Sequence, residues 1–586
     1  MNSIVCIKPV TTKNNLDRKG INEIDLNAIE EAIRLKEKLG GKTIGITMGT
    51  KLSEVVLKKA MSLGIDETVL VTDNKFAGSD TNATAYVLSK TITKIKQYDL
   101  IICGNNSSDS ATGQVGIELA NKLSIPFAIN VIEVKVIDDK TIECKSITEF
   151  GTVKTILKLP ALITVLKDIN VPRIPTIKQI LESQNKNVKK YNSEDIETED
   201  KYCGLIGSPT KVISTFRINN RKKECKIIEG TIDSKVNKIL EIIRENQNIN
   251  ANNNEETFEE NNNSDTHKIW IYAEENNGEI TKNTLELLGK GRELADKSSS
   301  SLEAIIVTNE TSNLDKLIKY GADKVYCVNS NTKNYCSISK KILKIIKEHN
   351  PQIFLLGKTF YGKIIAAYVA SELNTGLSAD CIDLDIDDDK KLIQKRVVYN
   401  GELMANIICP NTFPQMATIS SNIFKTKYNK NHKGDIFIID DDIESSQDNI
   451  NVKEINYSNE ENIEDAKFII AAGGGVKTQE SFEKLQKLAN NLKAKVGVTR
   501  RLVDLGFSNY KYQIGQSGKT VDTNLYIACG ISGASEHILG VNSKIVLAIN
   551  NNPKAPIFDI ADYGVIEDVD NIIPILMEKI KEEDAK

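Results

Sequence analysis

The stretch from Gln513 to His537, QIGQSGKTVDTNLYIACGISGASEH, contains two turns built from glycine and serine, GQSGK and GISGA, on either side of an apolar segment typical of a β-strand. Turns of this kind let backbone N–H groups approach an anionic or planar ligand closely. His537 follows the second turn and is one of only four histidines in the chain. The pattern predicts a phosphate-bearing cofactor that His537 could tune. Two ordinary strand-to-helix turns are the alternative interpretation.

Composition narrows the class of protein. The chain has 586 residues, a net charge of −4, one tryptophan and ten cysteines without a C-x-x-C pair. The length predicts about three to five domains. The charge argues against a nucleic-acid partner, and the cysteine spacing argues against zinc and iron–sulfur sites. No apolar run reaches the ~20 residues of a transmembrane helix, and no signal-peptide pattern opens the chain. We therefore expect a soluble, cytoplasmic protein without a metal site.

Short apolar segments rich in β-branched residues alternate with helical patterns, which is typical of a doubly wound parallel sheet. The same order of elements returns after residue 267, and AMSLGIDETVLV (60–71) matches the spacing of LIKYGADKVYCV (317–328). One fold used twice, at an offset of about 250 residues, is the prediction; a general likeness between doubly wound domains is the alternative. The predicted strands are 4–8, 43–48, 68–72, 99–104, 268–274, 302–308, 324–328 and 353–357.

Changes in composition suggest where the domains end. An Asn- and Glu-rich stretch at 246–266 has almost no apolar residues and is typical of a flexible linker. A third α/β unit starts near Ala466, where a strand (467–472), the turn GGG (473–475) and an amphipathic helix follow one another. The predicted segments are two α/β domains at 1–183 and 267–464, an arm at 184–245, the linker, and a cofactor-binding domain at 465–586.

The order of the motifs resembles a known family. From Phe468 to Val569, FIIAAGGGVKT, VGVTRRLVD, GQSGKTVDTNLYIACGISGASEHILG and IVLAINNN resemble the FAD-binding domain of the electron-transferring flavoprotein α subunit. Residues 267–424 continue this likeness with ELLGKGRELADK and NTGLSADC, whereas residues 1–245 resemble the β subunit through FAGSDTNATA and TGQVGIELANKLSIP. The resemblance implies a β–α fusion: two related doubly wound domains forming a pseudo-twofold base, plus a Rossmann-like FAD-binding domain.

The resemblance also implies an FAD site. It places His537 near O2 of the flavin, where a donating or protonated imidazole stabilises an anionic semiquinone, and it places the Ser517 hydroxyl near N5. Arg500 would lie beside the ring with Thr499 nearby; donors and positive charge there raise the potential of the ring. A surface ion pair is the alternative for Arg500. The other implied FAD contacts are Gly515, Gln516, Gly518, Ser532, Gly533, Ala534, Ser535, Glu536, Asn550, Asp568 and Val569.

Two positions of this site carry alternatives. Asp568 matches a residue at the adenosine end, but a helix N-cap is an equally good interpretation. Many α subunits have an arginine in the first glycine turn, where this chain has Gly474. The corresponding pyrophosphate contact is then missing or comes from Lys477 or Arg501.

The β-like half contains a second constellation. TGQVG should open a helix whose N-terminal N–H groups suit a phosphate. In the family this site holds either AMP or, in bifurcating members, a second FAD that reacts with NADH. FAGSDT (76–81) favours the second FAD, whereas Asn105 and Ala111 depart from the bifurcating pattern, so both options stay open. The implied contacts are Cys6, Asn22, Asp25, Asp80, Thr81, Asp109, Thr112, Gly113, Gln114, Val115 and Gly116.

The resemblance implies a flavin electron carrier that accepts electrons from a dehydrogenase, such as the acyl-CoA dehydrogenases of fatty acid β-oxidation, and passes them to a downstream redox acceptor. NADH-dependent electron bifurcation with two FAD is the first alternative, and only that activity would make the chain an enzyme in its own right. A non-redox nucleotide-binding regulatory module is the second alternative. The segment around Asp195 and Ile196 matches the region that docks partners in the family, with an exposed linker as the other interpretation. No residue is predicted to be catalytic.

Overall fold

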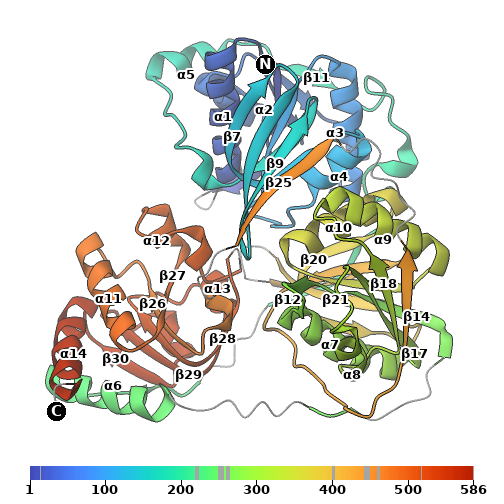
Figure 1. The fold of residues 1–586 in the computed structure, drawn as a ribbon. Coiled ribbons are helices and arrows are strands. Elements are labelled where there is room, and N and C mark those ends of the chain that lie inside the picture. Colours follow the sequence, from blue (N-terminus) through green and yellow to red (C-terminus); the bar gives the residue numbers. More distant parts are fainter. Residues whose placement is uncertain are drawn as a thin grey trace. The chain divides into compact units, whose positions relative to one another are not determined.

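The computed structural model shows three α/β regions (Figure 1). It describes residues 1–12, 15–217, 223–247, 256–258, 264–398, 403–440, 449–457, 462–516 and 518–584. Contacts group the chain into two compact units, which are described separately. The first unit comprises Met1–Thr215, Glu256–Val398 and Ala405–Ser458, and the second comprises Phe216–Glu255, Tyr399–Met404 and Asn459–Lys586.

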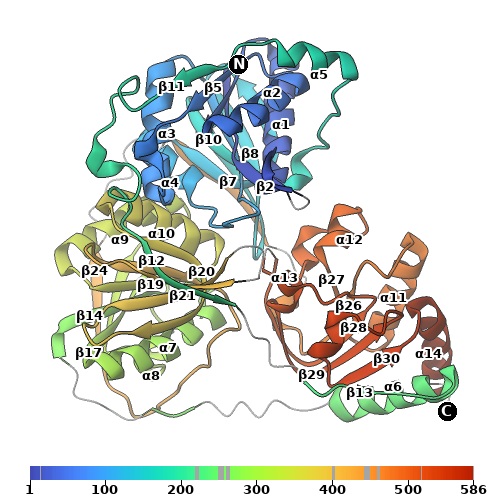
Figure 2. The ribbon, with the colours of Figure 1, turned by 180° about the vertical axis from the view of Figure 1, so that it is seen from behind.

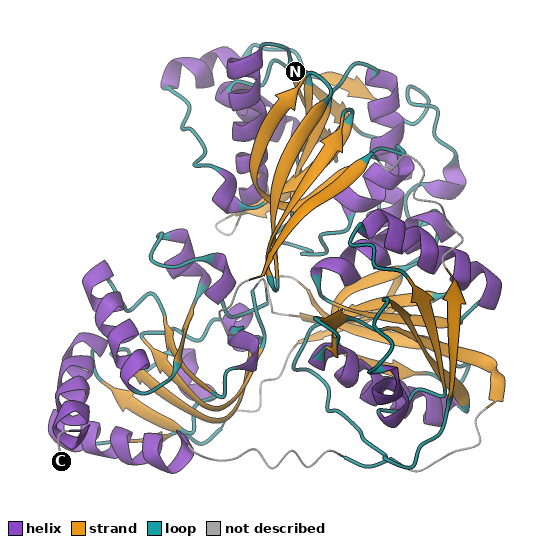
Figure 3. Cartoon of the chain, in the orientation of Figure 1, coloured by secondary structure: helices purple, strands orange, loops and turns teal. Residues whose placement is uncertain are grey.

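The first half of the first unit is built around a ten-stranded sheet. Helices flank this sheet (Figure 3). Its strand order is β11-β5-β4-β1-β6-β10-β7-β8-β9-β25. The strands from β11 to β7 pair in parallel, and β7, β8 and β9 form an antiparallel meander. The elements are β1 (Ser3–Cys6), β2 (Pro9–Thr12), β3 (Asn15–Ile21), α1 (Glu23–Leu39), β4 (Thr43–Met48), α2 (Glu54–Leu63), β5 (Glu67–Val71), α3 (Thr81–Ile95), β6 (Leu100–Gly104), α4 (Val115–Lys122), β7 (Phe127–Asp138), β8 (Thr141–Thr148), β9 (Gly151–Lys158), β10 (Ala161–Val165), α5 (Ile177–Gln184) and β11 (Lys189–Tyr191).

The second half repeats this sheet, in the order β24-β18-β17-β14-β19-β23-β20-β21-β22-β12. Its central strands are again parallel, and β20 and β21 are antiparallel. The elements are β12 (Lys211–Arg217), β14 (Ser264–Tyr272), β15 (Glu275–Asn276), β16 (Glu279–Ile280), α7 (Lys282–Ser298), β17 (Ser300–Val307), α8 (Leu314–Lys319), β18 (Lys324–Asn329), α9 (Tyr335–His349), β19 (Ile353–Gly357), α10 (Phe360–Leu373), β20 (Leu377–Ile386), β21 (Leu392–Val398), β22 (Leu403–Ile408), β23 (Gln415–Ile419), β24 (Asp435–Asp440) and β25 (Ile450–Tyr457).

The two halves correspond strand by strand, and they exchange their outermost strands. β25 follows the second half in sequence but pairs antiparallel with β9 of the first half. In return, β12 follows the first half in sequence and is the neighbour of β22 in the second. The halves also share one apolar core, in which Phe127 packs on Tyr335 with ring centroids 5.5 Å apart. The predicted doubly wound fold used twice is confirmed; the antiparallel meanders and the exchanged strands were not predicted.

The second unit is a six-stranded parallel sheet in the order β13-β30-β29-β28-β26-β27 (Figure 2). Helix α6 comes from the predicted arm, and its Val236, Ile239 and Ile243 are buried in the same core as Phe482 of α11 and Ile572 of α14. The predicted five-segment division of the chain stays a prediction. The elements are β13 (Lys226–Ile227), α6 (Ile232–Gln247), β26 (Phe468–Ala472), α11 (Gln479–Asn491), β27 (Lys495–Val498), α12 (Arg500–Asp504), β28 (Val521–Cys529), α13 (Ser535–Ile538), β29 (Val541–Asn550), β30 (Tyr563–Ile566) and α14 (Val569–Asp584).

Candidate functional site

One edge of the second unit's sheet collects most of the residues predicted for the FAD site. Ligands of parallel α/β sheets bind outside the carboxyl ends of the strands, and five neighbouring strands end at this edge. Thr499 follows β27, and Gly473 follows β26. Gly530 follows β28, Asn550 ends β29, and Asp568 stands two residues after β30. The topology therefore brings together segments that are up to about 100 residues apart in the sequence.

Glycine lets two turns of this edge pack backbone against backbone. A Cβ atom on Gly475 would lie 2.7 Å from the Cα of Gly530, and a Cβ on Gly533 would lie 2.1 Å from the backbone nitrogen of Ile557. Gly533 also has a φ of 87°, which favours glycine. Within the described part of this unit, the backbone N–H groups from Ser532 to Ser535 donate no hydrogen bond to the protein. A run of such donors is suited to an anion.

The turn GQSGK lies against the short helix α13. The backbone N–H of Gln516 donates to the carbonyl of Glu536 at 2.7 Å, and that of Gly518 donates to the carbonyl of Gly515 at 2.9 Å. Gly515 has a φ of 136°, and a Cβ there would lie 2.6 Å from the Glu536 carbonyl oxygen. Ser517 lies outside the described residues, so its predicted place near N5 stays a prediction.

His537 is buried and bonded on both ring nitrogens. Its side chain is 6% exposed. Nδ1 lies 3.0 Å from the carbonyl of Ile514, and Nε2 lies 2.8 Å from the hydroxyl of Tyr526. A carbonyl only accepts, so Nδ1 carries the hydrogen, and Nε2 of the neutral ring accepts from Tyr526. Burial lowers the pKa of His537 to about 4, against which the bond to Ile514 acts to raise it.

This geometry refines the expected role of the histidine. A neutral ring in this tautomer has no second hydrogen to give to a flavin oxygen. Donation from Nε2 to a flavin oxygen needs a proton on Nε2 and a Tyr526 hydroxyl that has moved away from it, because a hydroxyl that accepted this hydrogen would take it from the flavin. Tyr526 is fully buried in β28. Tyr526 was not predicted from the sequence as a partner of His537. The available signal was that the two residues lie 11 positions apart, on a strand and on the helix that follows its turn.

Three side chains follow β27. Thr499 precedes α12, and its hydroxyl oxygen is buried without a hydrogen-bond partner among the described residues. Arg500 is partly exposed, with Nε 3.7 Å from the Asp504 carboxylate. Arg501 reaches back over the first glycine turn, so that a Cβ on Gly474 would lie 2.7 Å from its Cδ. A guanidinium therefore lies beside the position where Gly474 replaces the arginine of many α subunits.

The residues at the far end of the edge have structural roles. Asn550 donates from its amide to the carbonyl of Ile531 at 2.8 Å and so fixes the second glycine turn. Asp568 accepts from the backbone N–H of Asp570 at 3.1 Å and from the Asn551 amide at 3.2 Å. Asp568 thus caps the N-terminus of α14, which is the alternative interpretation given for this residue above. Val569 is the first residue of α14 and is buried.

The predicted second nucleotide site lies at the carboxyl ends of β1 and β6. Lys8, two residues after β1, donates from its ammonium to the Ser107 and Ser110 hydroxyls, each at 3.0 Å, and to the Asp109 carboxylate at 2.6 Å. Lys8 thereby closes the loop that runs from Asn105 to Gly113. Sequence reasoning missed Lys8, although a cation two residues after Cys6 at the end of the first strand was visible.

A buried carboxyl group supports this loop from below. Asp25 accepts from the backbone N–H of Lys8 at 2.7 Å and from the Asn22 amide at 3.1 Å. Asn22 in turn accepts from the backbone N–H of Ser108 at 3.1 Å. Burial raises the pKa of Asp25 to about 7, while these donors and the Lys8 charge act to lower it. A Cβ on Gly104 would lie 2.2 Å from its Oδ1.

The FAGSDT motif contacts the protein's own arm. The Asp80 carboxylate caps α3 through the N–H of Ala83 at 3.0 Å and accepts from the Thr210 hydroxyl at 2.8 Å. The Thr81 hydroxyl donates toward the Gln114 amide oxygen at 3.0 Å. Thr112, Gly113 (φ 67°), Gln114 and Val115 lead into α4, and Gly116 packs so closely on β10 that a Cβ would lie 2.5 Å from Thr164.

Family comparison agrees with this arrangement. The electron transfer flavoprotein domain matches residues 14–196 and 269–443, and the electron transfer flavoprotein FAD-binding domain matches residues 462–542. The chain belongs to the electron transfer flavoprotein family. Its first unit carries the flavoprotein domain twice, and its second unit carries the FAD-binding domain.

Relatives named as α subunits or as FixB match the C-terminal part of the chain, in agreement with a β–α fusion. An electron transfer flavoprotein subunit alpha of Thermoanaerobacterium thermosaccharolyticum is 41% identical over 326 residues, which are 54% of this chain and 99% of the relative. A Protein FixB of Clostridium saccharobutylicum is 38% identical over 327 residues, 54% of this chain and 96% of the relative. An acryloyl-CoA reductase electron transfer subunit beta of Anaerotignum propionicum is 33% identical over 350 residues, which are 54% of this chain and 95% of the relative.

The residues at the carboxyl edge of the second unit fit an FAD. A buried Thr499 hydroxyl without a partner, a glycine cradle that a Cβ would fill, and adjacent N–H donors suit a ligand that is both planar and anionic. Within the described ranges no helix is long and apolar enough to cross a bilayer. No group of three metal-binding side chains occurs among those residues either.

Proposed function

We propose that this flavoprotein is a soluble, cytoplasmic electron carrier that holds one FAD at the carboxyl edge of the second unit's sheet. The match of the FAD-binding domain to residues 462–542 is the observation that carries the proposal. When bound, the flavin supplies the acceptance and release of electrons. The protein's part is to hold the cofactor, orient its ring and adjust its charge.

Several of the predicted contacts have a defined part in this proposal. The N–H groups of Ser532 to Ser535 bind the pyrophosphate, and Arg501 supplies the positive charge that Gly474 lacks. The Thr499 hydroxyl and the Arg500 guanidinium lie beside the ring. His537 is held by Ile514 and Tyr526, so a proton on Nε2 is the means by which it would stabilise negative charge on the reduced ring.

Gly533 provides a test with a matched control. Gly533→Ala adds a Cβ that collides with Ile557, whereas Gly506→Ala in the same unit adds one in open space at a similar φ of 77°. We expect the first variant to lose bound FAD and the second to keep it, as read from the flavin absorbance and the FAD released per chain. Thr499→Val, which keeps the shape of the side chain, should weaken FAD binding about tenfold. Purified protein that takes up no FAD on reconstitution would contradict the proposal.

We also propose that the first half of the first unit binds an adenine nucleotide, AMP or a second FAD, at the loop from Asn105 to Gly116. The support is the cluster of Lys8, Asn22 and Asp25 beneath that loop. The nucleotides released on denaturation, with their stoichiometry, distinguish the two. Two FAD per chain together with NADH oxidation would establish the bifurcating alternative that FAGSDT favours. One FAD and one AMP without NADH reactivity would exclude it.

A dehydrogenase, such as an acyl-CoA dehydrogenase, is the proposed electron donor, and a downstream redox protein the acceptor. The relative named as an electron transfer subunit of acryloyl-CoA reductase supports a donor or acceptor that handles acyl-CoA. Ile196 in the segment around Asp195 is 3% exposed and therefore offers a partner little apolar contact area. Instead, the segment before and within α5 exposes Val171, Ile174, Ile177 and Leu181.

Replacing one of these side chains tests the docking surface. Ile174→Asp should slow electron transfer from an acyl-CoA dehydrogenase about tenfold while leaving the FAD content unchanged, because it places a charge in an apolar contact. Ile137→Asp on β7, which is also exposed, is the control and should transfer electrons at the parental rate. Equal rates for the two variants would contradict docking through α5.

A further inference from the structure

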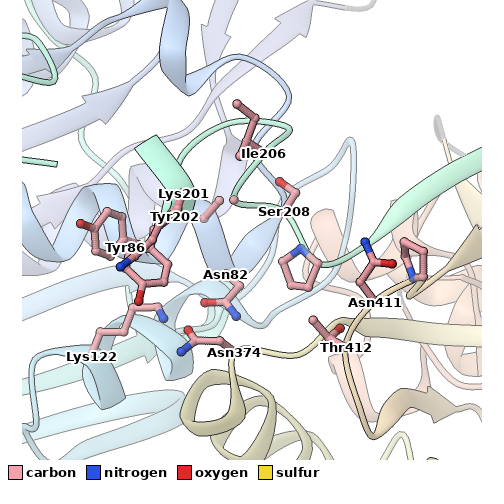
Figure 4. A pocket seen from close by; sticks show the side chains of 14 residues that line it. Asn82, Tyr86, Lys122, Lys201, Tyr202, Ile206, Ser208, Asn374, Asn411 and Thr412 are labelled. Atoms are coloured by element: carbon pink, nitrogen blue, oxygen red, sulfur yellow. The ribbon is translucent and has the colours of Figure 1, made fainter. Parts of the chain in front are cut away.

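A cavity with a mixed polar and apolar lining lies within the first unit, where its two halves meet. Its volume is about 210 Å³. α3 and α4 of the first half form one wall, and residues 201–209 of the arm form another. The third wall comes from the second half, at Asn374 and at Pro410 to Thr412 (Figure 4). A water molecule takes up about 30 Å³ of the liquid, so there is room for a small polyatomic ligand with some of its waters.

The polar side chains that face this cavity have unused hydrogen-bonding capacity. Asn82 is only 7% exposed, and its amide has no hydrogen-bond partner in the described ranges of the chain. The Thr412 hydroxyl oxygen is buried and equally unpartnered there. Asn374 and Asn411, which are both exposed, also line the cavity, and Figure 4 shows Asn82 and Asn374 directed toward the same space. Buried polar groups of folded proteins are nearly always paired, so the Thr412 hydroxyl indicates an occupant, for which the three amides are additional donors.

Lys122, the last residue of α4, indicates that this occupant is an anion. Its ammonium forms no hydrogen bond or ion pair with any residue that the structure describes. Burial lowers its pKa, and the nearest carboxyl groups act only through space to raise it. Two of these are engaged elsewhere: Asp80 binds Thr210, and Glu372 accepts from Asn121 at 3.0 Å. The third, Glu118, has its pKa raised to about 8 by burial and is protonated at neutral pH.

The other cation of the lining is already paired. Lys201 binds the Glu199 carboxylate at 2.9 Å and lies over the Tyr202 ring at 4.8 Å. The Tyr202 ring in turn packs against that of Tyr86 at 5.1 Å. Among the lining residues that the structure describes, Lys122 is therefore the cation without an ion pair that a ligand can neutralise.

We propose that this cavity binds a small oxyanion, either a phosphate group or a carboxylate. The Lys122 ammonium neutralises the charge, and the asparagine amides and the Thr412 hydroxyl donate to the oxygens. Because the lining comes from both halves and from the arm, the bound anion holds the three together. Lys122 lies about 12 Å along α4 from the nucleotide site at the start of that helix, whereas Asn82, on the other side of the cavity, directly follows Thr81 of the predicted nucleotide site.

Calorimetry and thermal unfolding of the purified holoprotein test this inference, because the FAD and nucleotide sites are then filled. Inorganic phosphate and acetate are titrated in turn, with sodium chloride at equal ionic strength as the reference. Binding of either anion is expected, and the pair tells a phosphate site from a carboxylate site. Lys122→Met should weaken the binding at least tenfold, whereas Lys38→Met, in the last turn of α1 and away from the cavity, should leave it unchanged.

Thr412→Val keeps the test decisive if Lys122→Met fails to fold. It removes a hydroxyl that lacks a partner, so the variant should be at least as stable as the parent without anion and should gain less stability when anion is added. Heat and stabilisation no greater than those given by sodium chloride would overturn the inference, and so would equal anion binding by the parent and Lys122→Met. The cavity would then hold water alone.

Discussion

The two halves of the first unit have the same strand order but carry different charges at equivalent positions. In each half a glycine ends the strand beside the first one and lies on a short polar side chain: Gly104 on Asp25, and Gly357 on Asn283. Two residues after the first strand, one half has Lys8 and the other has Glu274. The shared backbone fixes where a ligand could lie, and the side chain at this position decides whether an anion is accepted there.

The contacts of the two side chains make the difference concrete. Lys8 gathers three oxygen atoms of the loop that follows β6. Glu274 is buried and accepts from the Thr359 hydroxyl at 2.6 Å, and burial raises its pKa to about 8. It is therefore protonated at neutral pH and offers no positive charge. This explains why the proposed nucleotide belongs to the first half only.

The largest expected effect comes from the charge of Glu274. Its pKa in the folded protein lies above the ordinary value of 4.5, so between about pH 4.5 and 8 the folded state keeps a proton that the unfolded state has lost. The stability that protonated Glu274 contributes is therefore fully present below the unfolded-state pKa of 4.5, and it is lost as the pH rises through the folded-state pKa of about 8. Glu274→Gln should raise the free energy of unfolding by up to about 4 kcal/mol at alkaline pH and by little at acid pH.

Denaturant unfolding at about pH 5 and about pH 9 measures this difference. Glu275→Gln, at the partly exposed neighbouring position, is the control and should show no such pH dependence. A constant difference between parent and Glu274→Gln at both pH values would contradict the buried, protonated state.

A second test removes the ion pair that Lys358, which follows Gly357, forms with Asp380. Asn105 and Asn130 in the first half correspond to Lys358 and Asp380 in the second, where the ammonium and carboxylate are 2.9 Å apart. Lys358→Asn leaves Asp380 buried without this partner and should lower the free energy of unfolding by about 3 kcal/mol. Adding Asp380→Asn copies the neutral pair of the first half and should restore most of the loss. Unfolding curves of the single and double variants that show simple additivity would refute the coupling.

The paired glycines separate stability from binding. A Cβ would lie 2.2 Å from Asp25 at Gly104 and 2.3 Å from Asn283 at Gly357. Each change to alanine should therefore destabilise the protein by about 1–3 kcal/mol through crowding. Only Gly104→Ala should also release the adenine nucleotide, as measured by chromatography of the denatured protein. Loss of nucleotide from Gly357→Ala as well would show that the halves do not differ in this way.

The smallest expected effect is on nucleotide retention alone. Lys8→Met keeps the length of the side chain but removes the three bonds to the loop, so we expect nucleotide affinity to fall about tenfold with little change in fold. Lys42→Met, at another lysine of the same half with an exposed ion pair to Glu67, should retain the nucleotide. Equilibrium dialysis with AMP and with FAD compares the two. Equal affinity in both variants would remove Lys8 from the site.

Sequence predicted what depends on local pattern. The apolar segments at 43–48 and 353–357 became β4 and β19 with unchanged bounds, because a buried parallel strand is a continuous apolar run bounded by turns. The family motifs also predicted FAD residues, some of which, such as Thr499, directly follow a strand of the second unit's sheet. Their contacts with FAD stay a prediction.

Contacts between distant segments were out of reach of such patterns. β25 pairs with β9 although about 300 residues separate them, and nothing in either strand specifies its partner. The bond from Tyr526 to His537 depends on how far a strand and a turn lie apart in space. Lys8 and Glu274 can be read from the sequence, but only the matching strand orders of the two sheets show that they occupy equivalent positions.

The reciprocal strand exchange has a consequence for how the gene can be divided. Each half finishes the other's sheet, so a polypeptide ending after the first half would leave β9 as an open edge and carry β12 without a host sheet, an arrangement that invites aggregation. Two separate polypeptides made together would instead clasp each other through the same two strands. Fusion of the halves therefore adds a covalent tether to an assembly that is already interlocked.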